Sequence, residues 1–81
     1  MKQLKLFGRE YCSLCHVMRE QLQHLTQQHQ FTFTWIDIED IAELEALYGE
    51  LVPVLTDENG VEICHYHLAA QALDVSLAKI S

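Results

Sequence analysis

The chain has 81 residues, which is enough for one small domain and too few for two. Hydrophobic residues make up 49% of it and charged residues 21%, a composition typical of a folded globular domain. Its 12 acidic and 5 basic residues give a net charge of −7, which argues against binding to the phosphate backbone of nucleic acids.

The first half of the chain alternates between strand and helix patterns. The apolar run 4–7, which ends at Gly8, predicts a buried strand. From Leu14 onward, apolar residues recur at helical spacing, so a helix follows. The run 31–38 is rich in aromatic and β-branched residues and predicts a second strand.

The second half predicts a helix, a hairpin and a last helix. The segment 40–43 resembles a capping box, with Asp in place of Ser or Thr, at the start of a helix. A strand follows at 52–56, with its proline at the N-terminal end. The pair Asn59-Gly60 predicts a hairpin turn into a return strand at 61–66. The last helix presents one apolar face, made by Ala69, Ala72, Leu73, Leu77 and Ile80.

These elements predict a single α/β domain over residues 1–81 with the order βαβαββα. A helical crossover joins the first two strands, which are therefore expected to be parallel. The hairpin makes the last two strands antiparallel. One mixed four-stranded sheet flanked by three helices satisfies both conditions.

Two of the three cysteines form a Cys12-x-x-Cys15 motif at the start of the first predicted helix. The unpaired N–H groups and the positive dipole end at a helix N-terminus lower the pKa of a thiol. Cys12 comes first and lies nearer these groups, so we assign it as the nucleophile. Cys15 follows within one helical turn and is the resolving thiol. Arg9 adds a positive charge near Cys12, and Tyr11 either shapes the pocket there or covers the core.

The cysteine count and the N-terminal sequence indicate the compartment. An odd number of cysteines does not make the disulfide scaffold of a small secreted protein. The cationic segment 1–9 lacks the apolar region of a secretion signal, and no apolar run is long enough to span a membrane. We therefore expect a cytoplasmic protein that does not bind membranes.

For Cys64 we expect packing as a small hydrophobic residue rather than a third redox role.

Metal binding is the main alternative. Cys12, Cys15, Cys64, His65 and His67 include thiolate and imidazole groups suited to zinc or an iron–sulfur cluster. On a strand, however, positions 65 and 67 share one face and position 64 lies on the other, so these three do not converge easily. We therefore predict no metal site. A metal-binding or non-catalytic binding module stays the alternative function.

The order of the elements, with Cys-x-x-Cys at the first helix and Pro53 before the hairpin, resembles glutaredoxins and minimal thioredoxins, and most closely small bacterial glutaredoxin-like proteins. The segment Tyr48–Leu55 (Tyr-Gly-x-x-Val-Pro-Val-Leu) is similar to the one in which their cis-proline faces the two cysteines. The resemblance implies a thioredoxin-like fold, a cis Val52–Pro53 bond, and a Val52 backbone that pairs with extended substrates. It also implies a thiol–disulfide oxidoreductase with a redox-active disulfide and no required cofactor.

The sequence leaves the electron donor undecided between glutathione and a reductase. Glutaredoxins carry a Gly-Gly pair after the hairpin, where this chain has bulkier residues at 63–68. Ten acidic residues and one basic residue give the segment 37–81 a net charge of −9. This charge weighs against the binding of glutathione, which is an anion. We expect these acidic residues to lie away from the cysteine pair. Arg9 matches the cation that glutaredoxins use for the glutathione carboxylate.

The expected partners are protein or glutathione mixed disulfides, and the expected oligomeric state is a monomer. The residues that we assign to substrate binding are Arg9, Tyr11, Val52 and Pro53.

Overall fold

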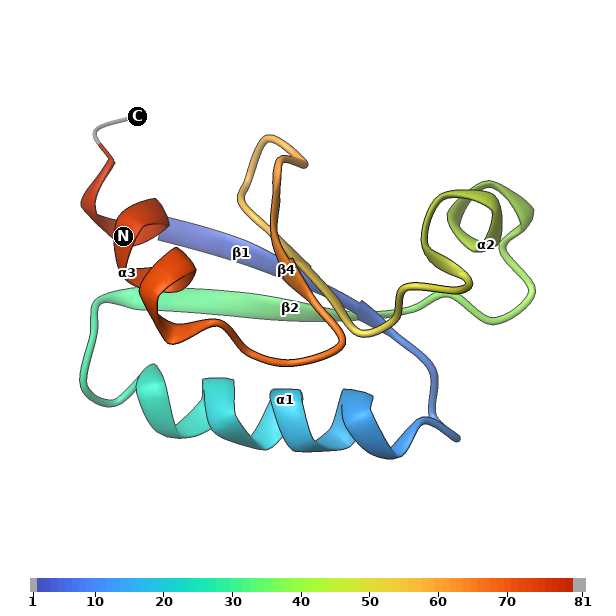
Figure 1. Cartoon of the computed structure of the whole chain (residues 1–81), viewed down its shortest axis with the longest axis horizontal. Coiled ribbons are helices and arrows are strands. Elements are labelled where there is room, and N and C mark those ends of the chain that lie inside the picture. The colour runs from blue at the N-terminus through green and yellow to red at the C-terminus, as the bar shows by residue number, and fades with distance from the viewer. Residues whose placement is uncertain (1, 80–81) are drawn as a thin grey trace.

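A mixed four-stranded sheet organises the computed structural model, which describes residues 2–79 (Figure 1). Its elements in chain order are β1 (Lys2–Gly8), α1 (Ser13–Leu25), β2 (Phe31–Asp37), α2 (Ala42–Tyr48), β3 (Val54–Thr56), β4 (Glu62–His65) and α3 (Ala70–Ala78). The strand order is β2-β1-β3-β4. As predicted, β1 and β2 are parallel, while β3 and β4 are antiparallel. Strands β3 and β4 are both shorter than the sequence pattern indicated.

Each face of the sheet buries its own apolar cluster. On one face, Leu4 and Leu6 of β1 pack with Met18 of α1 and with side chains of α3. On the other face, Phe7 packs with Val54 and with side chains of α2. Successive strand residues point to opposite faces, so the short apolar run of β1 contributes to both clusters. The sheet is therefore covered by α1 and α3 on one side and by α2 on the other.

The start of α2 differs from the expectation. Asp40 does not cap the helix: it has a φ of 63°, and α2 begins after Ile41, whose side chain makes no capping hydrogen bond. The Asp37 carboxylate instead accepts a hydrogen bond from the Glu39 N–H at 2.9 Å, which closes a turn directly after β2. The predicted capping box was wrong, because an N-cap residue needs extended backbone and Asp40 is in the left-handed region.

The predicted hairpin turn is confirmed. The Asp57 carboxylate accepts hydrogen bonds from the N–H groups of Asn59, at 2.8 Å, and Val61, at 3.0 Å. Gly60 has a φ of 84°, a conformation that glycine adopts without steric cost. The turn therefore depends on one carboxylate and one glycine.

Helix α3 buries Leu73, and Leu77 packs against the same cluster, as the predicted apolar face required. Ala69 is exposed just before the helix. Ile80, the last residue of the predicted face, lies outside the described residues. Between residues 2 and 79, no helix combines the length and the hydropathy needed to cross a membrane.

One edge of the sheet collects the segments that carry the sequence motifs. Gly8 at the end of β1 pairs with Asp37 at the end of β2, and Phe7 pairs with Val54 at the start of β3. The turn into α1, the segment after β2 and the residues before β3 therefore all leave the sheet at this edge.

Candidate redox site

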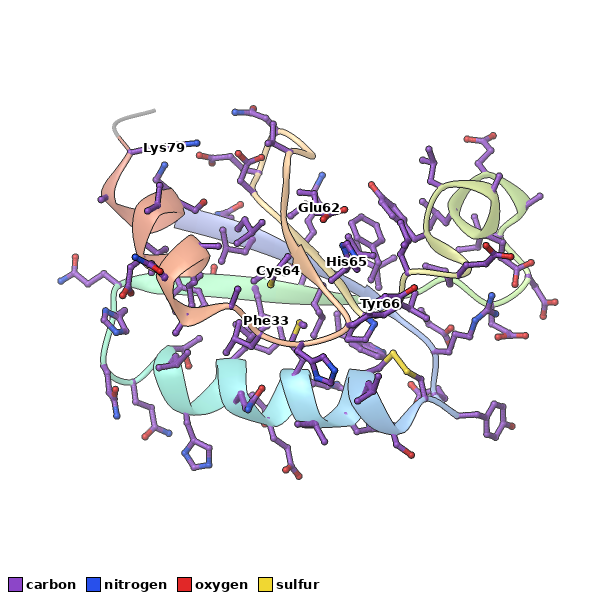
Figure 2. The ribbon with its side chains drawn as sticks, in the orientation of Figure 1. Phe33, Glu62, Cys64, His65, Tyr66 and Lys79 are labelled. Atoms are coloured by element: carbon purple, nitrogen blue, oxygen red, sulfur yellow. A yellow bond between two sulfur atoms is a disulfide. The ribbon has the colours of Figure 1, made fainter. Side chains whose placement is uncertain are left out.

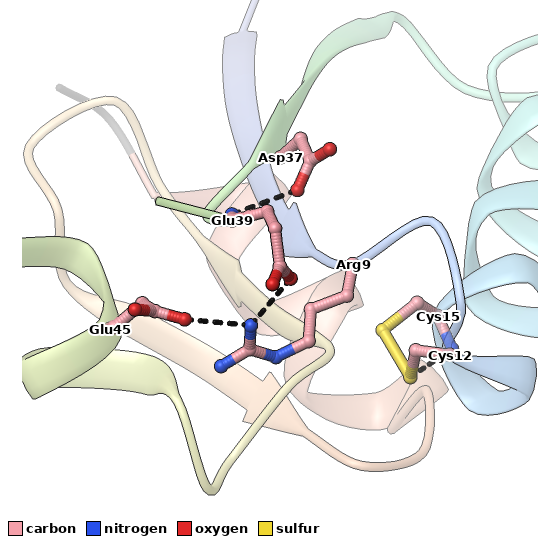
Figure 3. A network of polar contacts seen from close by, with 6 residues as sticks. All are labelled: Arg9, Cys12, Cys15, Asp37, Glu39 and Glu45. Carbon is pink, nitrogen blue, oxygen red and sulfur yellow. Dashed lines mark hydrogen bonds and ion pairs between the residues drawn. A yellow bond between two sulfur atoms is a disulfide. The ribbon is translucent and has the colours of Figure 1, made fainter. Parts of the chain in front are cut away.

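Cys12 and Cys15 form a disulfide at the N-terminus of α1, with their Cα atoms 5.1 Å apart (Figure 3). Cys12 is the residue that precedes the helix, and its N–H donates to the Arg9 carbonyl at 3.2 Å, which closes the turn from β1. The Cys15 N–H donates to the Cys12 sulfur at 3.1 Å. The Cys12 sulfur thus lies at the end of the helix that favours a negative charge.

The two sulfur-bearing residues differ in their exposure to solvent. Cys15 is fully buried, with 0% of its surface exposed, whereas Cys12 is partly exposed. Attack on a substrate disulfide requires access for one thiol, and the resolving step requires only that the second thiol reach the first. The geometry therefore suits Cys12 to the first role and Cys15 to the second.

Trp35 and Gly8 close the buried side of this disulfide. A Cβ atom added at Gly8 would lie 2.6 Å from the Trp35 ring and 3.0 Å from the Cys15 sulfur. The Arg19 guanidinium covers the Trp35 ring at 4.7 Å from its centroid. A glycine at the end of β1 is therefore what allows the indole and the sulfur to approach the strand.

Arg9 forms ion pairs with two carboxylates. Its Nη1 donates to Glu39 Oε2 at 2.7 Å and to Glu45 Oε1 at 2.8 Å. Figure 3 shows the side chain extending from the turn toward both carboxylates, away from the disulfide. The hydrogen bonds that Arg9 donates, first to Glu45 and then to Glu39, raise the pKa of Arg9, so the guanidinium stays charged. Two carboxylates against one guanidinium leave this cluster with a net negative charge.

The expectation that the acidic half of the chain lies away from the cysteine pair was wrong. Glu39 and Glu45 come from that half, and both contact Arg9, whose carbonyl accepts the Cys12 N–H. The one sequence signal for the contact between Arg9 and Glu39 was the predicted parallel pairing of the first two strands, because it brings the residues after each strand to the same edge. Nothing in the sequence pattern indicated Glu45, which lies 36 positions from Arg9.

The remaining residues assigned to substrate binding lie in different surroundings. Tyr11 is 94% exposed, so it does not cover the core. The Val52–Pro53 peptide bond is cis, and Pro53 is buried. The Val52 N–H donates to the Tyr48 carbonyl at 3.1 Å, so it is already engaged and not free to pair with an extended substrate.

A groove lined by both polar and apolar atoms lies beside the disulfide, between α1 and the loop from β4 to α3. Its apolar lining residues are Leu14, Val17, Met18, Tyr66 and Leu68. Leu14, which separates the two cysteines in the sequence, is 40% exposed, and Tyr66 is 41% exposed. The Tyr66 hydroxyl donates to the Glu50 carbonyl at 2.9 Å, and its N–H donates to the Pro53 carbonyl at 2.9 Å. These bonds connect the groove to the segment that carries the cis-proline.

Cys64 lies in the core, as predicted, with 8% of its surface exposed. Figure 2 shows its sulfur among core side chains and apart from the disulfide. Burial raises the pKa of the Cys64 thiol. His65, the next residue, has its Nδ1 2.8 Å from Glu62 Oε2. In the part of the chain that the structure describes, no three His, Cys, Asp or Glu side chains are grouped to hold a metal ion.

Comparison with known proteins gives three consistent findings. The family model "Glutaredoxin-like domain (DUF836)" matches residues 3–78. The solution structure of protein Ne2328 from Nitrosomonas europaea is 33% identical, with 95% of this chain and 92% of that chain covered and a TM-score of 0.84. The X-ray structure of target protein XcR50 from X. campestris is also 33% identical, with 96% and 99% covered and a TM-score of 0.69. Among curated proteins, no sequence matches the chain.

More distant structures show the fold alone. Thioredoxin O1 from Arabidopsis thaliana, in its oxidised state, is 18% identical, with 95% of this chain and 75% of that chain covered and a TM-score of 0.64. Together with the element order and the strand order, this similarity confirms the thioredoxin-like fold predicted from the sequence.

Proposed function

This chain belongs to the glutaredoxin-like domain family, and on that basis we propose that it is a thiol–disulfide oxidoreductase that works through Cys12 and Cys15. One observation carries the proposal: the disulfide lies at a helix N-terminus, with one partly exposed cysteine and one fully buried cysteine. The hydrogen bond from the Cys15 N–H to the Cys12 sulfur supports the thiolate form of Cys12 after reduction.

The proposed reaction transfers two electrons from the protein dithiol to a substrate disulfide. The Cys12 thiolate attacks one substrate sulfur, the substrate S–S bond breaks, and the other sulfur leaves as a thiolate that takes up a proton. Cys15 then loses its proton and attacks the Cys12 sulfur of the mixed disulfide. The second substrate thiol is released, and the Cys12–Cys15 disulfide forms. A reductase or glutathione supplies the electrons that restore the dithiol.

The surroundings of the disulfide support the choice of substrates. The side chains that neighbour the cysteines of a protein disulfide would enter the groove containing Leu14 and Tyr66, and glutathione mixed disulfides are smaller substrates of the same chemistry. Tyr11 and Val52 are the proposed contacts outside the groove, and the buried Pro53 positions Val52 through their shared cis peptide bond. In this proposal the protein acts as a cytoplasmic monomer, and the cycle requires neither a metal ion nor an organic cofactor.

The test compares the reduced wild type with two variants on hydroxyethyl disulfide and on a protein disulfide. We expect Cys12→Ser to lose turnover on both substrates. Cys15→Ser is expected to stop after one substrate equivalent, with a mixed disulfide on Cys12 that mass spectrometry detects. Cys64→Ser is the matched control and should keep the wild-type rate. Turnover no faster than that of a free thiol at equal concentration would contradict the proposal.

A further inference from the structure

The Arg9–Glu39–Glu45 cluster lies directly beside the reactive turn. The Arg9 carbonyl accepts the Cys12 N–H at 3.2 Å, so the backbone of Arg9 holds the turn that carries the exposed cysteine. The side chain of Arg9 is 26% exposed, and those of Glu39 and Glu45 are 46% and 39% exposed. All three charged groups are therefore in contact with solvent near the turn that carries Cys12.

The charge of the guanidinium is already opposed by two carboxylates. Its Nη1 already donates to both carboxylates, and a Cβ atom added at Gly49 would lie 3.5 Å from its Nη2, so that side of the group faces the end of α2. A guanidinium recognises a carboxylate best by presenting two parallel N–H groups. A substrate anion that approached the N–H groups of Arg9 would have to stay beside both Glu39 and Glu45, whose negative charges repel it.

Further charges at this edge are mostly acidic; the exception is Arg19, whose guanidinium covers the Trp35 ring on the buried side of the disulfide. Glu10 is exposed next to Arg9, and Asp37 closes the turn before Glu39. Lys2 begins β1, and Lys79 lines one pocket together with Asp57 of the hairpin turn, so both lie toward the opposite end of β1 from Arg9. The field at the redox edge is therefore negative, and it repels an anion before it reaches the sulfur.

From this arrangement we propose that the Arg9–Glu39–Glu45 cluster selects substrates by charge: the site favours neutral and cationic disulfides and disfavours anionic ones, glutathione disulfide among them. The inference rests on the proposed function and adds the substrate class to it. A physiological substrate would carry Lys or Arg beside its disulfide, and a protein reductase would supply the electrons in place of glutathione.

The test uses disulfides of three charges at neutral pH: cystamine is cationic, hydroxyethyl disulfide is neutral, and dithiodiglycolate and glutathione disulfide are anionic. These disulfides differ in intrinsic reactivity, so the quantity to compare is the ratio of kcat/KM between variant and wild type for each one. The double variant Glu39→Gln, Glu45→Gln keeps amide oxygens that can accept the Arg9 N–H groups and removes both negative charges. We expect it to raise kcat/KM for both anions by about three- to tenfold, to lower that for cystamine by a similar factor, and to leave the neutral disulfide unchanged.

The matched control is the double variant Glu58→Gln, Asp74→Asn, which changes the net charge equally at exposed positions on the hairpin and on α3. It should leave all the ratios near one at about 0.1 M salt, where the Debye length is about 10 Å. Equal ratios for every substrate in the first variant, or the same pattern in the control, would overturn the charge selection while leaving the proposed function intact. Failure of the wild type to reduce hydroxyethyl disulfide faster than a free thiol would overturn both. The single variants Glu39→Gln and Glu45→Gln each remove one exposed charge and should give intermediate ratios.

Discussion

Cys12, Cys15 and Cys64 carry the same functional group and differ in what surrounds it. Cys12 is partly exposed, and its sulfur accepts a backbone N–H, while the other two lie in the interior with 0% and 8% of their surfaces exposed. The raised pKa of Cys64 keeps it in the unreactive thiol form well into the alkaline range, because burial disfavours the thiolate. Reactivity should therefore separate the three residues sharply.

We predict that Cys12 is the only thiol of the reduced native protein that iodoacetamide modifies readily at neutral pH. Cys15 and Cys64 should react more slowly by at least about tenfold, because alkylation needs both access and a thiolate. The measurement is the time course of labelling of each tryptic peptide by mass spectrometry. The denatured protein is the control, and all three thiols should react there. Labelling of Cys64 as fast as that of Cys12 in the folded protein would show that the core opens at this position.

The contact between β1, β2 and α1 at the redox edge depends on the absence of one side chain. Gly8 ends β1 where the Trp35 ring and the Cys15 sulfur both approach the strand. Close packing of this kind leaves no room for an extra methyl group unless neighbouring atoms move. The position of α1, and with it that of the disulfide, is thus set partly by Gly8.

We predict that Gly8→Ala lowers the free energy of unfolding by about 1–3 kcal/mol, the usual cost of overpacking a filled interior. Denaturant unfolding followed by far-ultraviolet circular dichroism measures this change. The fluorescence of Trp35, the single tryptophan of the chain, should also change in the folded variant, because its ring has to shift. Gly60→Ala is a useful comparison: a Cβ atom there meets no atom within 4 Å, so any cost comes from its φ of 84° and leaves Trp35 unaffected. An unchanged stability and spectrum for Gly8→Ala would contradict the packing argument.

Local sequence patterns predicted the elements and the cysteine pair well, because both depend on neighbouring residues. The apolar spacing fixed the order of strands and helices, and the position of Cys12 and Cys15 after the first strand placed them at a helix N-terminus. The capping box failed because the backbone of Asp40 follows from the turn that Asp37 closes. The parallel pairing of the first two strands brings Glu39 to the end of β1, but Glu45 was not predictable, since it lies 36 positions from Arg9 and meets it only once α2 is packed.

Across the protein as a whole, charge acts over a distance that salt concentration sets. The described chain measures 33 × 23 × 17 Å and the net charge is −7. At about 0.01 M salt the Debye length is about 30 Å, so a substrate at the disulfide is affected by nearly every charge of the protein. At about 0.1 M it falls to about 10 Å, and the charges nearest the disulfide, those around Arg9 among them, dominate the effect on the substrate. The two double variants remove equal charge at different distances from Cys12 and so separate these two regimes.

We predict that the rate of cystamine reduction falls several-fold as salt rises from about 0.01 to 0.5 M, that the rate for glutathione disulfide rises, and that hydroxyethyl disulfide shows little change. Two double variants are compared at the lowest salt: the first is Glu39→Gln, Glu45→Gln, and the second is Glu58→Gln, Asp74→Asn. Both should weaken this dependence, because each removes two negative charges from the protein. Above about 0.1 M only the first variant should still differ from the wild type, because its charges pair with Arg9 of the turn that carries Cys12, whereas those of the control lie on the hairpin and on α3. Stopped-flow measurement of Trp35 fluorescence during oxidation gives the rates directly. If the two variants behaved alike at every salt concentration, the net charge and not the Arg9 cluster would determine which disulfides react.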